Sequence, residues 1–149
     1  REGLFNLLNA RVDLEGLRVL ELFGGTGMVA LEFLSRDCGS VTSVESDTKA
    51  VRGMSTLARD WDIDDWSVVR GNALQFIERS LTQYDLIFAD PPYDLPELPE
   101  LPERVLGGSL LVPGGWFILE HGERTDVSGC AHYVETRKYG HVHFSLFTT

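Results

Sequence analysis

The residues of this chain best suited to chemistry are Asp90, Pro91, Pro92 and Tyr93, which follow an apolar run. Proline has no N–H to give to a sheet, so a strand that reaches Asp90 must leave the sheet there. In an open parallel sheet, ligands bind at the edge where the strands end. The motif therefore holds a carboxylate, a backbone carbonyl and an aromatic ring together, which suits the binding of a flat group that bears an amine.

A glycine turn near the start of the chain forms a second candidate site. Arg18–Phe23 predicts a strand, Gly24–Gly27 a turn and Met28–Arg36 a helix. Strand, glycine turn and helix form the entry to a nucleotide-binding βαβ unit. The glycines let a ligand approach the backbone, and the first turn of the helix offers free N–H groups.

Two acids flank this turn at positions that fit a nucleoside cofactor. Glu45 lies about 20 residues after the glycines, where an acid accepts hydrogen bonds from a ribose diol. Glu21 precedes the turn and is placed to meet the amino group of a methionine moiety. Gly25–Ala30 also fits the dinucleotide fingerprint G-x-G-x-x-A, so a nicotinamide cofactor is an alternative. Glu21 and the Asp90–Tyr93 motif, which has no role in hydride transfer, favour S-adenosylmethionine.

The elements that position these residues alternate between strand and helix. Strands are expected at Arg18–Phe23, Ser40–Glu45, Ser67–Arg70, Leu86–Asp90 and Trp116–Glu120, followed by an antiparallel pair at Ala131–Thr136 and Val142–Phe147 that brackets Arg137–His141. Helices are expected at Arg1–Ala10, Met28–Arg36, from the N-cap Asp47 to Trp61, from Ala73 to Leu81 and at Glu103–Leu106, with a loop at Asp94–Pro102 and a turn at Pro113–Gly115. This order predicts a doubly wound, Rossmann-like and mostly parallel α/β sheet of seven strands that ends in an antiparallel hairpin.

Length and composition limit the classes of protein to be considered. A chain of 149 residues is expected to form one domain, over residues 1–149. The net charge of -10 argues against a nucleic-acid site that depends on a basic surface alone. No apolar run approaches the length of a membrane span, and the start of the chain lacks a signal-peptide pattern. Cys38 and Cys130 have no metal-ligand spacing, so free thiols in a cytoplasmic protein without a metal are expected.

These motifs together resemble a known group of enzymes. Glu21–Gly27 and Asp90–Tyr93 look like the class I S-adenosylmethionine-dependent methyltransferases that modify exocyclic or amide nitrogens. Within that group, the whole chain is similar to the bacterial family that methylates the N2 amine of a guanine in 16S ribosomal RNA. The stretches that match this family are Arg1–Asn6, Leu31–Arg36, Glu120-His121 and Lys138–Gly140.

The resemblance implies a cofactor, a substrate and a set of site residues. The cofactor would be S-adenosylmethionine and the substrate 16S ribosomal RNA, within a 30S particle or an assembly intermediate whose proteins supply basic contacts. Asp90 and the Pro91 carbonyl would accept the two amine hydrogens, and Tyr93 would stack on the base. The residues implied to bind the cofactor are Glu21, Phe23, Gly24, Gly25, Thr26, Gly27, Glu45, Ser46, Asn72, Ala73 and Asp90, and the catalytic motif is Asp90, Pro91, Pro92 and Tyr93.

The resemblance also has implications for the segment before Arg1, for the first helix and for the oligomeric state. Family members carry some tens of residues before the position of Arg1, so we expect that this N-terminal segment of the family is missing here. The resemblance favours closure of Phe5 and Asn6 over the cofactor, with packing of the first helix as the alternative. A monomer is expected.

Alternatives to this function come from different classes of protein. A DNA adenine-N6 methyltransferase shares the Asp90–Tyr93 motif, although it normally needs a target-recognition segment. A non-catalytic RNA-binding module and a nicotinamide-nucleotide-binding module are further alternatives. Among single residues, Asn72 fits a turn residue and an adenine contact equally well. We expect His121 to be structural, and Trp61 and Trp66 to be packing aromatics.

Overall fold

The computed structural model describes residues 2–149, so the Arg1 part of the Arg1–Asn6 match lies outside the described residues. Its helices are α1 (Glu2–Asn9), α2 (Met28–Ser35), α3 (Thr48–Asp60), α4 (Ala73–Arg79), η1 (Leu98–Glu100, a 3-10 turn) and α5 (Leu101–Leu106). Its strands are β1 (Arg18–Leu22), β2 (Ser40–Glu45), β3 (Trp66–Arg70), β4 (Tyr84–Ala89), β5 (Leu111–His121), β6 (Tyr133–Tyr139) and β7 (Val142–Thr148).

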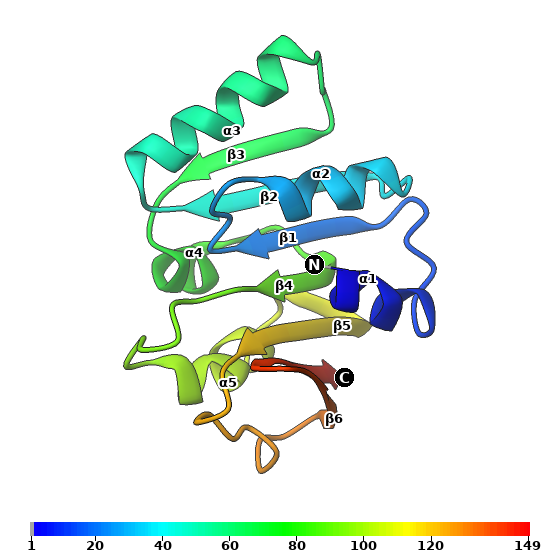
Figure 1. The fold of residues 1–149 in the computed structure, drawn as a ribbon, viewed down its shortest axis with the longest axis vertical. Helices are drawn as coiled ribbons and strands as arrows, with labels where there is room; N and C mark the ends of the chain where they lie inside the picture. The colour runs from blue at the N-terminus through cyan, green and yellow to red at the C-terminus, as the bar shows by residue number, and fades with distance from the viewer. Residues whose placement is uncertain (1) are drawn as a thin grey trace.

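The strands form one seven-stranded sheet in the order β3-β2-β1-β4-β5-β7-β6, as Figure 1 shows. The strands from β3 to β5 along this order are parallel, and β7 pairs antiparallel with both β5 and β6. Helices α1, α2 and α3 pack on one face and α4 and α5 on the other. The predicted doubly wound sheet with an antiparallel C-terminal hairpin is therefore confirmed.

Strand β4 is central because both of its faces are covered. Leu86 and Phe88 belong to the core under α1, α2 and α3, whereas Ile87 and Ala89 belong to the core under α4 and α5. A strand buried on both faces has a continuous apolar sequence, which is the pattern that precedes Asp90. The residue that follows β4 is consequently placed near the middle of the sheet edge.

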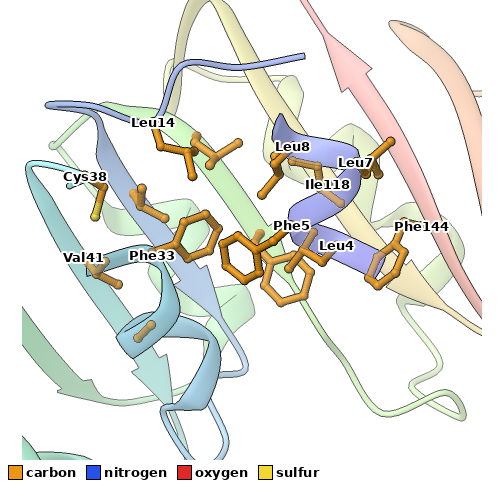
Figure 2. Packing of buried hydrophobic residues seen from close by; sticks show 14 of the residues in the cluster. Leu4, Phe5, Leu7, Leu8, Leu14, Phe33, Cys38, Val41, Ile118 and Phe144 are labelled. Carbon is orange, nitrogen blue, oxygen red and sulfur yellow. The ribbon is translucent and has the colours of Figure 1, made fainter. Parts of the chain in front are cut away.

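Helix α1 packs its apolar side into the first core, and this revises the expectation for Phe5. The side chains of Leu4, Phe5, Leu7 and Leu8 are all buried. The rings of Phe5 and Phe33 lie edge to face with centroids 4.9 Å apart, and they face each other in Figure 2. Phe5 therefore packs the first helix onto the sheet and does not close over a cofactor, while the expectation for Asn6 stays a prediction.

The C-terminal hairpin has a shorter connection than expected. Strand β6 continues to Tyr139, which pairs with Val142, so Gly140 and His141 alone join the two strands. Gly140 has a φ of 63°, which a glycine adopts without steric cost. The predicted connection over Arg137–His141 was too long, because Arg137, Lys138 and Tyr139 belong to β6 and pair with β7.

Three other sequence expectations differ from the structure. Pro113–Gly115 lies inside β5 as an irregularity, because Leu111 pairs with Tyr84 and Trp116 with Leu86. The expected loop Asp94–Pro102 contains η1 and the start of α5, each with a proline in its first turn, where the missing N–H costs nothing. Trp66 is buried as expected, but the Trp61 side chain is 68% exposed, so its prediction as a packing residue was wrong.

Cys38 and Cys130 are both free thiols, as their spacing predicted. No helix among residues 2–149 has the length and apolar character needed to cross a membrane.

We predict that Phe5→Ala lowers the free energy of unfolding by about 3–5 kcal/mol, because it removes a buried ring and leaves a cavity against Phe33. Urea unfolding monitored by circular dichroism measures this loss. Leu81→Ala is the matched control, since the Leu81 side chain is 100% exposed, and its effect should stay within about 0.5 kcal/mol. A loss below about 1 kcal/mol for Phe5→Ala would contradict the packing role of α1.

Candidate active site

The carboxyl ends of four neighbouring strands bring acidic side chains to one edge of the sheet. Glu21 lies in β1, Glu45 ends β2, Asp90 follows β4 and Glu120 lies next to the end of β5. The strands are in register here, because Leu22 pairs with Ala89 and Ala89 with Leu119. The sequence-predicted acids Glu21, Glu45 and Asp90 are therefore brought together, and Glu120 joins them.

The glycine turn between β1 and α2 depends on left-handed backbone conformations. Phe23, Gly25 and Gly27 have φ angles of 64°, 58° and 86°. Phe23 is a bulky residue in a conformation that costs free energy, and such residues concentrate at functional sites. At Gly27, an added Cβ would lie 2.8 Å from atoms of Met54 and Trp66, so only glycine fits there. No side chain caps α2 at Gly27, which leaves its first N–H groups available to a ligand.

The carboxylate of Glu45 is fixed in orientation by two backbone donors. The N–H of Gly25 donates to Oε1 at 2.9 Å, and the N–H of Asp47 donates to Oε2 at 2.8 Å. Each carboxylate oxygen still has capacity for a further hydrogen bond. Glu45 therefore links the glycine turn to the start of α3 and presents free acceptor sites suited to a pair of hydroxyl groups. Asp47 caps α3 as predicted, by accepting from the N–H of Ala50 at 2.9 Å.

A small, enclosed pocket of about 60 Å³ lies beside Glu45. Its lining residues are Phe23, Val44, Glu45, Ser46, Gly71, Asn72, Ala73, Leu74 and Leu95. Asn72 caps α4 by accepting from the N–H of Gln75 at 3.1 Å, so it serves as a turn residue, and it also lines the pocket. Thr26 lines a wider hollow of about 860 Å³ on the outer side of Glu45 and α3.

Glu21 is buried beneath the glycine turn. Its Oε1 accepts a hydrogen bond from Ser43 Oγ at 2.7 Å, and Trp66 Nε1 donates to the same Oγ at 2.9 Å. Burial raises the pKa of Glu21 to about 8, against the lowering effect of the Ser43 hydrogen bond and with further raising by Asp90 and Glu45. The carboxyl group is thus largely protonated near neutral pH until a cation reaches it.

The Asp90–Tyr93 segment leaves the sheet at the same edge and leads into a turn over 92–95, in which the N–H of Leu95 donates to the Pro92 carbonyl at 3.0 Å. The N–H of Asp90 donates to the Leu22 carbonyl at 3.2 Å, which ties the motif to the end of β1. The Tyr93 ring, 48% exposed, lies against Gly122, where an added Cβ would approach Tyr93 Cδ2 to 2.9 Å. A pocket of about 460 Å³ opens beside this ring, lined by Tyr93, Asp94, Gly122, Glu123, Arg124, Thr125 and His141.

Glu120 is a site residue that sequence reasoning missed. The hydroxyl of Tyr93 donates to Glu120 Oε2 at 3.5 Å, and Glu120 lies on the strand next to Asp90, since Ala89 pairs with Leu119. Burial first, and then the charge of Asp90, raise the pKa of Glu120 to about 7, and burial also raises the pKa of Asp90. The available signal was an acid near the end of the strand that follows the Asp90 motif in the parallel sheet.

His121 serves the structure, as expected. Its Nδ1 lies 2.9 Å from the Gly122 carbonyl and its Nε2 lies 2.6 Å from Ser145 Oγ, so the ring spans β5 and β7. The side chain is buried, and burial lowers its pKa. A neutral imidazole with Nδ1–H donating to the Gly122 carbonyl fits both contacts and holds the backbone on which Tyr93 rests.

We predict that Glu21→Gln removes a pH dependence of stability. A carboxyl group whose pKa rises from 4.5 to about 8 on folding contributes stability below pH 4.5 and loses it as the pH rises through about 8. As the pH rises from about 5 to about 8, the free energy of unfolding of Glu21→Gln should therefore increase relative to that of the wild type by about 1–3 kcal/mol. Urea unfolding across this range measures the difference, with the exposed Glu103→Gln as the control. Parallel curves for wild type and Glu21→Gln would contradict a buried, protonated Glu21.

Comparison with known proteins gives a consistent family. The model of the family described as conserved hypothetical protein 95 matches residues 1–148. Ribosomal RNA small subunit methyltransferase D of Escherichia coli K12 is 33% identical over 97 residues, which are 62% of this chain and 46% of that protein. The chain spans about half the length of the first curated relatives that it matches.

Solved structures share the fold over nearly the whole chain. The structure of yhhF from Escherichia coli has a TM-score of 0.86 and 25% identity, and the match covers 99% of this chain and 82% of that one. The structure of SMU.776 complexed with SAH has a TM-score of 0.76 and 15% identity, and covers 97% of this chain and 48% of that one.

Proposed function

Because this chain belongs to the family described as conserved hypothetical protein 95, we propose that it transfers a methyl group from S-adenosylmethionine to an exocyclic amine of an RNA base. The observation that carries this proposal is that the oriented Glu45 carboxylate and the Asp90–Tyr93 segment lie at the same edge of the sheet. The first would hold a nucleoside and the second an amine. The finer proposal for the substrate is the N2 amine of a guanine in 16S ribosomal RNA.

The cofactor would lie across the glycine turn. Glu45 would accept hydrogen bonds from the ribose hydroxyls, and the small pocket around Ser46, Asn72 and Ala73 would border the adenine. The methionine end would lie over Gly24–Gly27, where its ammonium group would meet Glu21. The match in fold to a structure that holds SAH, the demethylated form of this cofactor, supports this placement.

The target base would enter beside Tyr93. The pocket of about 460 Å³ lies within the size range of small-molecule sites, and the exposed ring supplies a stacking surface. Stacking of a base on an aromatic side chain contributes about 1–3 kcal/mol and requires the base to leave its helix. The name of the Escherichia coli relative supports ribosomal RNA as the substrate class.

The reaction would be a direct displacement at the sulfonium methyl group. The amine lone pair of a guanine is delocalised into the ring, so the nitrogen is a weak nucleophile. Asp90 and the Pro91 carbonyl would accept its two hydrogens and turn the lone pair toward the methyl carbon. Tyr93 would hold the base in that orientation. Asp90 would therefore act on the reacting nitrogen, whereas Glu45 and the glycine turn would hold the cofactor.

The net charge of -10 bears on the form of the substrate. Phosphate contacts need basic side chains, and an acidic protein gains little from them. We therefore propose a 30S particle or an assembly intermediate as the substrate, since its proteins can supply the basic contacts. Equal rates on protein-free 16S ribosomal RNA and on 30S particles would contradict this choice.

Calorimetric titration with S-adenosylmethionine, S-adenosylhomocysteine and NADH tests the cofactor. We expect the first two to bind and NADH not to bind, because Glu21 and the Asp90 motif have no partner in a nicotinamide nucleotide. Binding of NADH without binding of the other two would contradict the proposed cofactor and the methyl transfer that depends on it.

We predict that Asp90→Ala lowers the rate of methyl transfer to 30S particles by at least about 100-fold, since the amine loses its oriented acceptor. Cofactor affinity should change less than about tenfold, because the glycine turn and the two hydrogen bonds that orient the Glu45 carboxylate remain. Transfer of a radioactive methyl group measures the rate, with Asp64→Ala, an exposed acid distant in sequence from the motif, as the control. Full activity of Asp90→Ala would rule out this mechanism.

A further inference from the structure

The lysine and arginine side chains of this acidic protein differ in whether a carboxylate neutralises them. Within residues 2–149, those that form an ion pair are Arg11, Arg18, Arg36, Arg59, Arg104 and Arg137. Those for which this part of the chain supplies no such partner are Lys49, Arg52, Arg70, Arg79, Arg124 and Lys138. A cation of the second kind can bind an external anion without first losing an acid.

Several of the unpaired cations lie at the edge of the sheet where the parallel strands end, beside the candidate active site. Lys49 lies in the first turn of α3 directly after β2, Arg70 ends β3, and Arg124 follows β5. The paired Arg18 begins β1 at the opposite edge, and the paired Arg36 follows α2, which runs back toward that edge. The net charge therefore conceals free cations around the site.

Arg124 borders the pocket in which the proposed function places the target base. Among the described residues that line this pocket beside Tyr93, Arg124 is the only arginine or lysine. The adjacent carboxylate of Glu123 is engaged elsewhere, because its Oε1 lies 2.6 Å from Nδ1 of His141. Asp94, the other acid of the lining, forms no ion pair with Arg124 within residues 2–149. The exposed guanidinium group is thus free to bind an anion at the mouth of the pocket.

Lys138 brings a second free cation to the same end of the sheet. It lies opposite His143 of β7, which lies opposite His121 of β5, so the three side chains share one face of the sheet. The chain that leaves β5 after His121 leads directly to Arg124. The contact between His141 and the carboxylate after β5 joins the β6–β7 turn to the loop that carries Arg124.

We propose that Arg124 and Lys138 bind the RNA phosphates on either side of the target nucleotide. This inference rests on the proposed function, which places the base against Tyr93. A nucleotide that has left its helix still carries a phosphate on each side of its sugar, at the mouth of the pocket that holds its base. A guanidinium group binds a phosphate through two parallel hydrogen bonds, and an ammonium group binds it as a point charge.

The acids of the site give this contact a direction. A phosphate is repelled from the edge that carries Glu45 and Asp90 and is attracted to Arg124 and Lys138. The RNA backbone is therefore held outside Tyr93, with the base directed inward. Two phosphate contacts are compatible with a net charge of -10, since the proteins of a 30S particle supply the remaining contacts in the proposed function.

The dependence of RNA affinity on salt tests this site without any need for methylation. Fluorescence anisotropy of a labelled, short single-stranded RNA of mixed sequence measures the association constant K at several salt concentrations. For the double variant Arg124→Gln/Lys138→Gln, the slope of log K against log salt should be less steep by about 1.4, because each contact with a single strand contributes about 0.7.

Two further double variants are matched to this one. Arg59→Gln/Arg104→Gln has the same net charge but removes cations that already have acid partners, so it should keep the wild-type slope. Arg124→Lys/Lys138→Arg keeps both charges in place and should also keep that slope. The first variant controls for net charge and the second for a change in the shape of the loop and hairpin.

Methylation of 30S particles gives a second readout. Arg124→Gln/Lys138→Gln should raise KM for the particle by about tenfold and change kcat by less than about twofold, because the lost contacts act on binding and not on the reacting atoms. Calorimetric affinity for S-adenosylmethionine should stay at the wild-type value, since the cofactor would lie on the other side of Asp90.

The outcomes separate this inference from the proposed function. A weaker salt dependence in Arg124→Gln/Lys138→Gln alone, with a raised KM, supports the phosphate site. An equal change in Arg59→Gln/Arg104→Gln overturns it, because net charge would then explain the effect, and so does an unchanged slope or a wild type that binds no RNA at low salt. A wild type that shows the expected slopes but methylates no particle would instead overturn the proposed function and leave the phosphate site standing.

Discussion

The carboxyl edge of the parallel sheet is the constraint on which the rest of the site depends. Parallel pairing places the ends of β1, β2, β4 and β5 side by side, and each brings an acid to the same small volume. Negative charges at such short separation, partly removed from water, are unfavourable unless a hydrogen bond, a cation or a proton stabilises each of them. The fold treats two of these acids differently. Glu45 accepts hydrogen bonds from two backbone N–H groups, whereas burial raises the pKa of Glu21 to about 8 and Ser43 donates a hydrogen bond to it.

These differences divide the edge into functional regions. The backbone donors fix the orientation of the Glu45 carboxylate, which would suit neutral hydroxyl groups. Burial raises the pKa of Glu21 to about 8, and an ammonium group placed beside it would favour its ionised form. Asp90 and Glu120 lie beside the half-exposed ring of Tyr93, where the proposed function places the target amine. One sheet edge would thus offer three acidic environments to the three parts of the proposed reaction.

Much of this arrangement could be predicted from the sequence, because its local signals agree with its fold. The apolar run before Asp90 and the two prolines after it fix where β4 ends, and the glycines fix the turn after β1. Contacts between distant segments could not be predicted. The amphipathic pattern of α1 was compatible with both packing and cofactor closure, and only the Phe33 contact distinguishes them. Glu120 lies in a stretch that matches the family, but its place beside Asp90 and Tyr93 follows from the pairing of β4 with β5, which the sequence does not show.

The excess of negative charge at this edge has a consequence for turnover by the proposed reaction. S-adenosylmethionine brings a sulfonium cation, and its product is a neutral thioether of nearly the same shape. Acids that attract this cofactor electrostatically would lose that attraction as soon as the methyl group has moved. Spent cofactor would then be held mainly by its ribose, adenine and ammonium contacts. The same edge that favours the charged donor would favour its neutral product less, and charge alone would limit product inhibition.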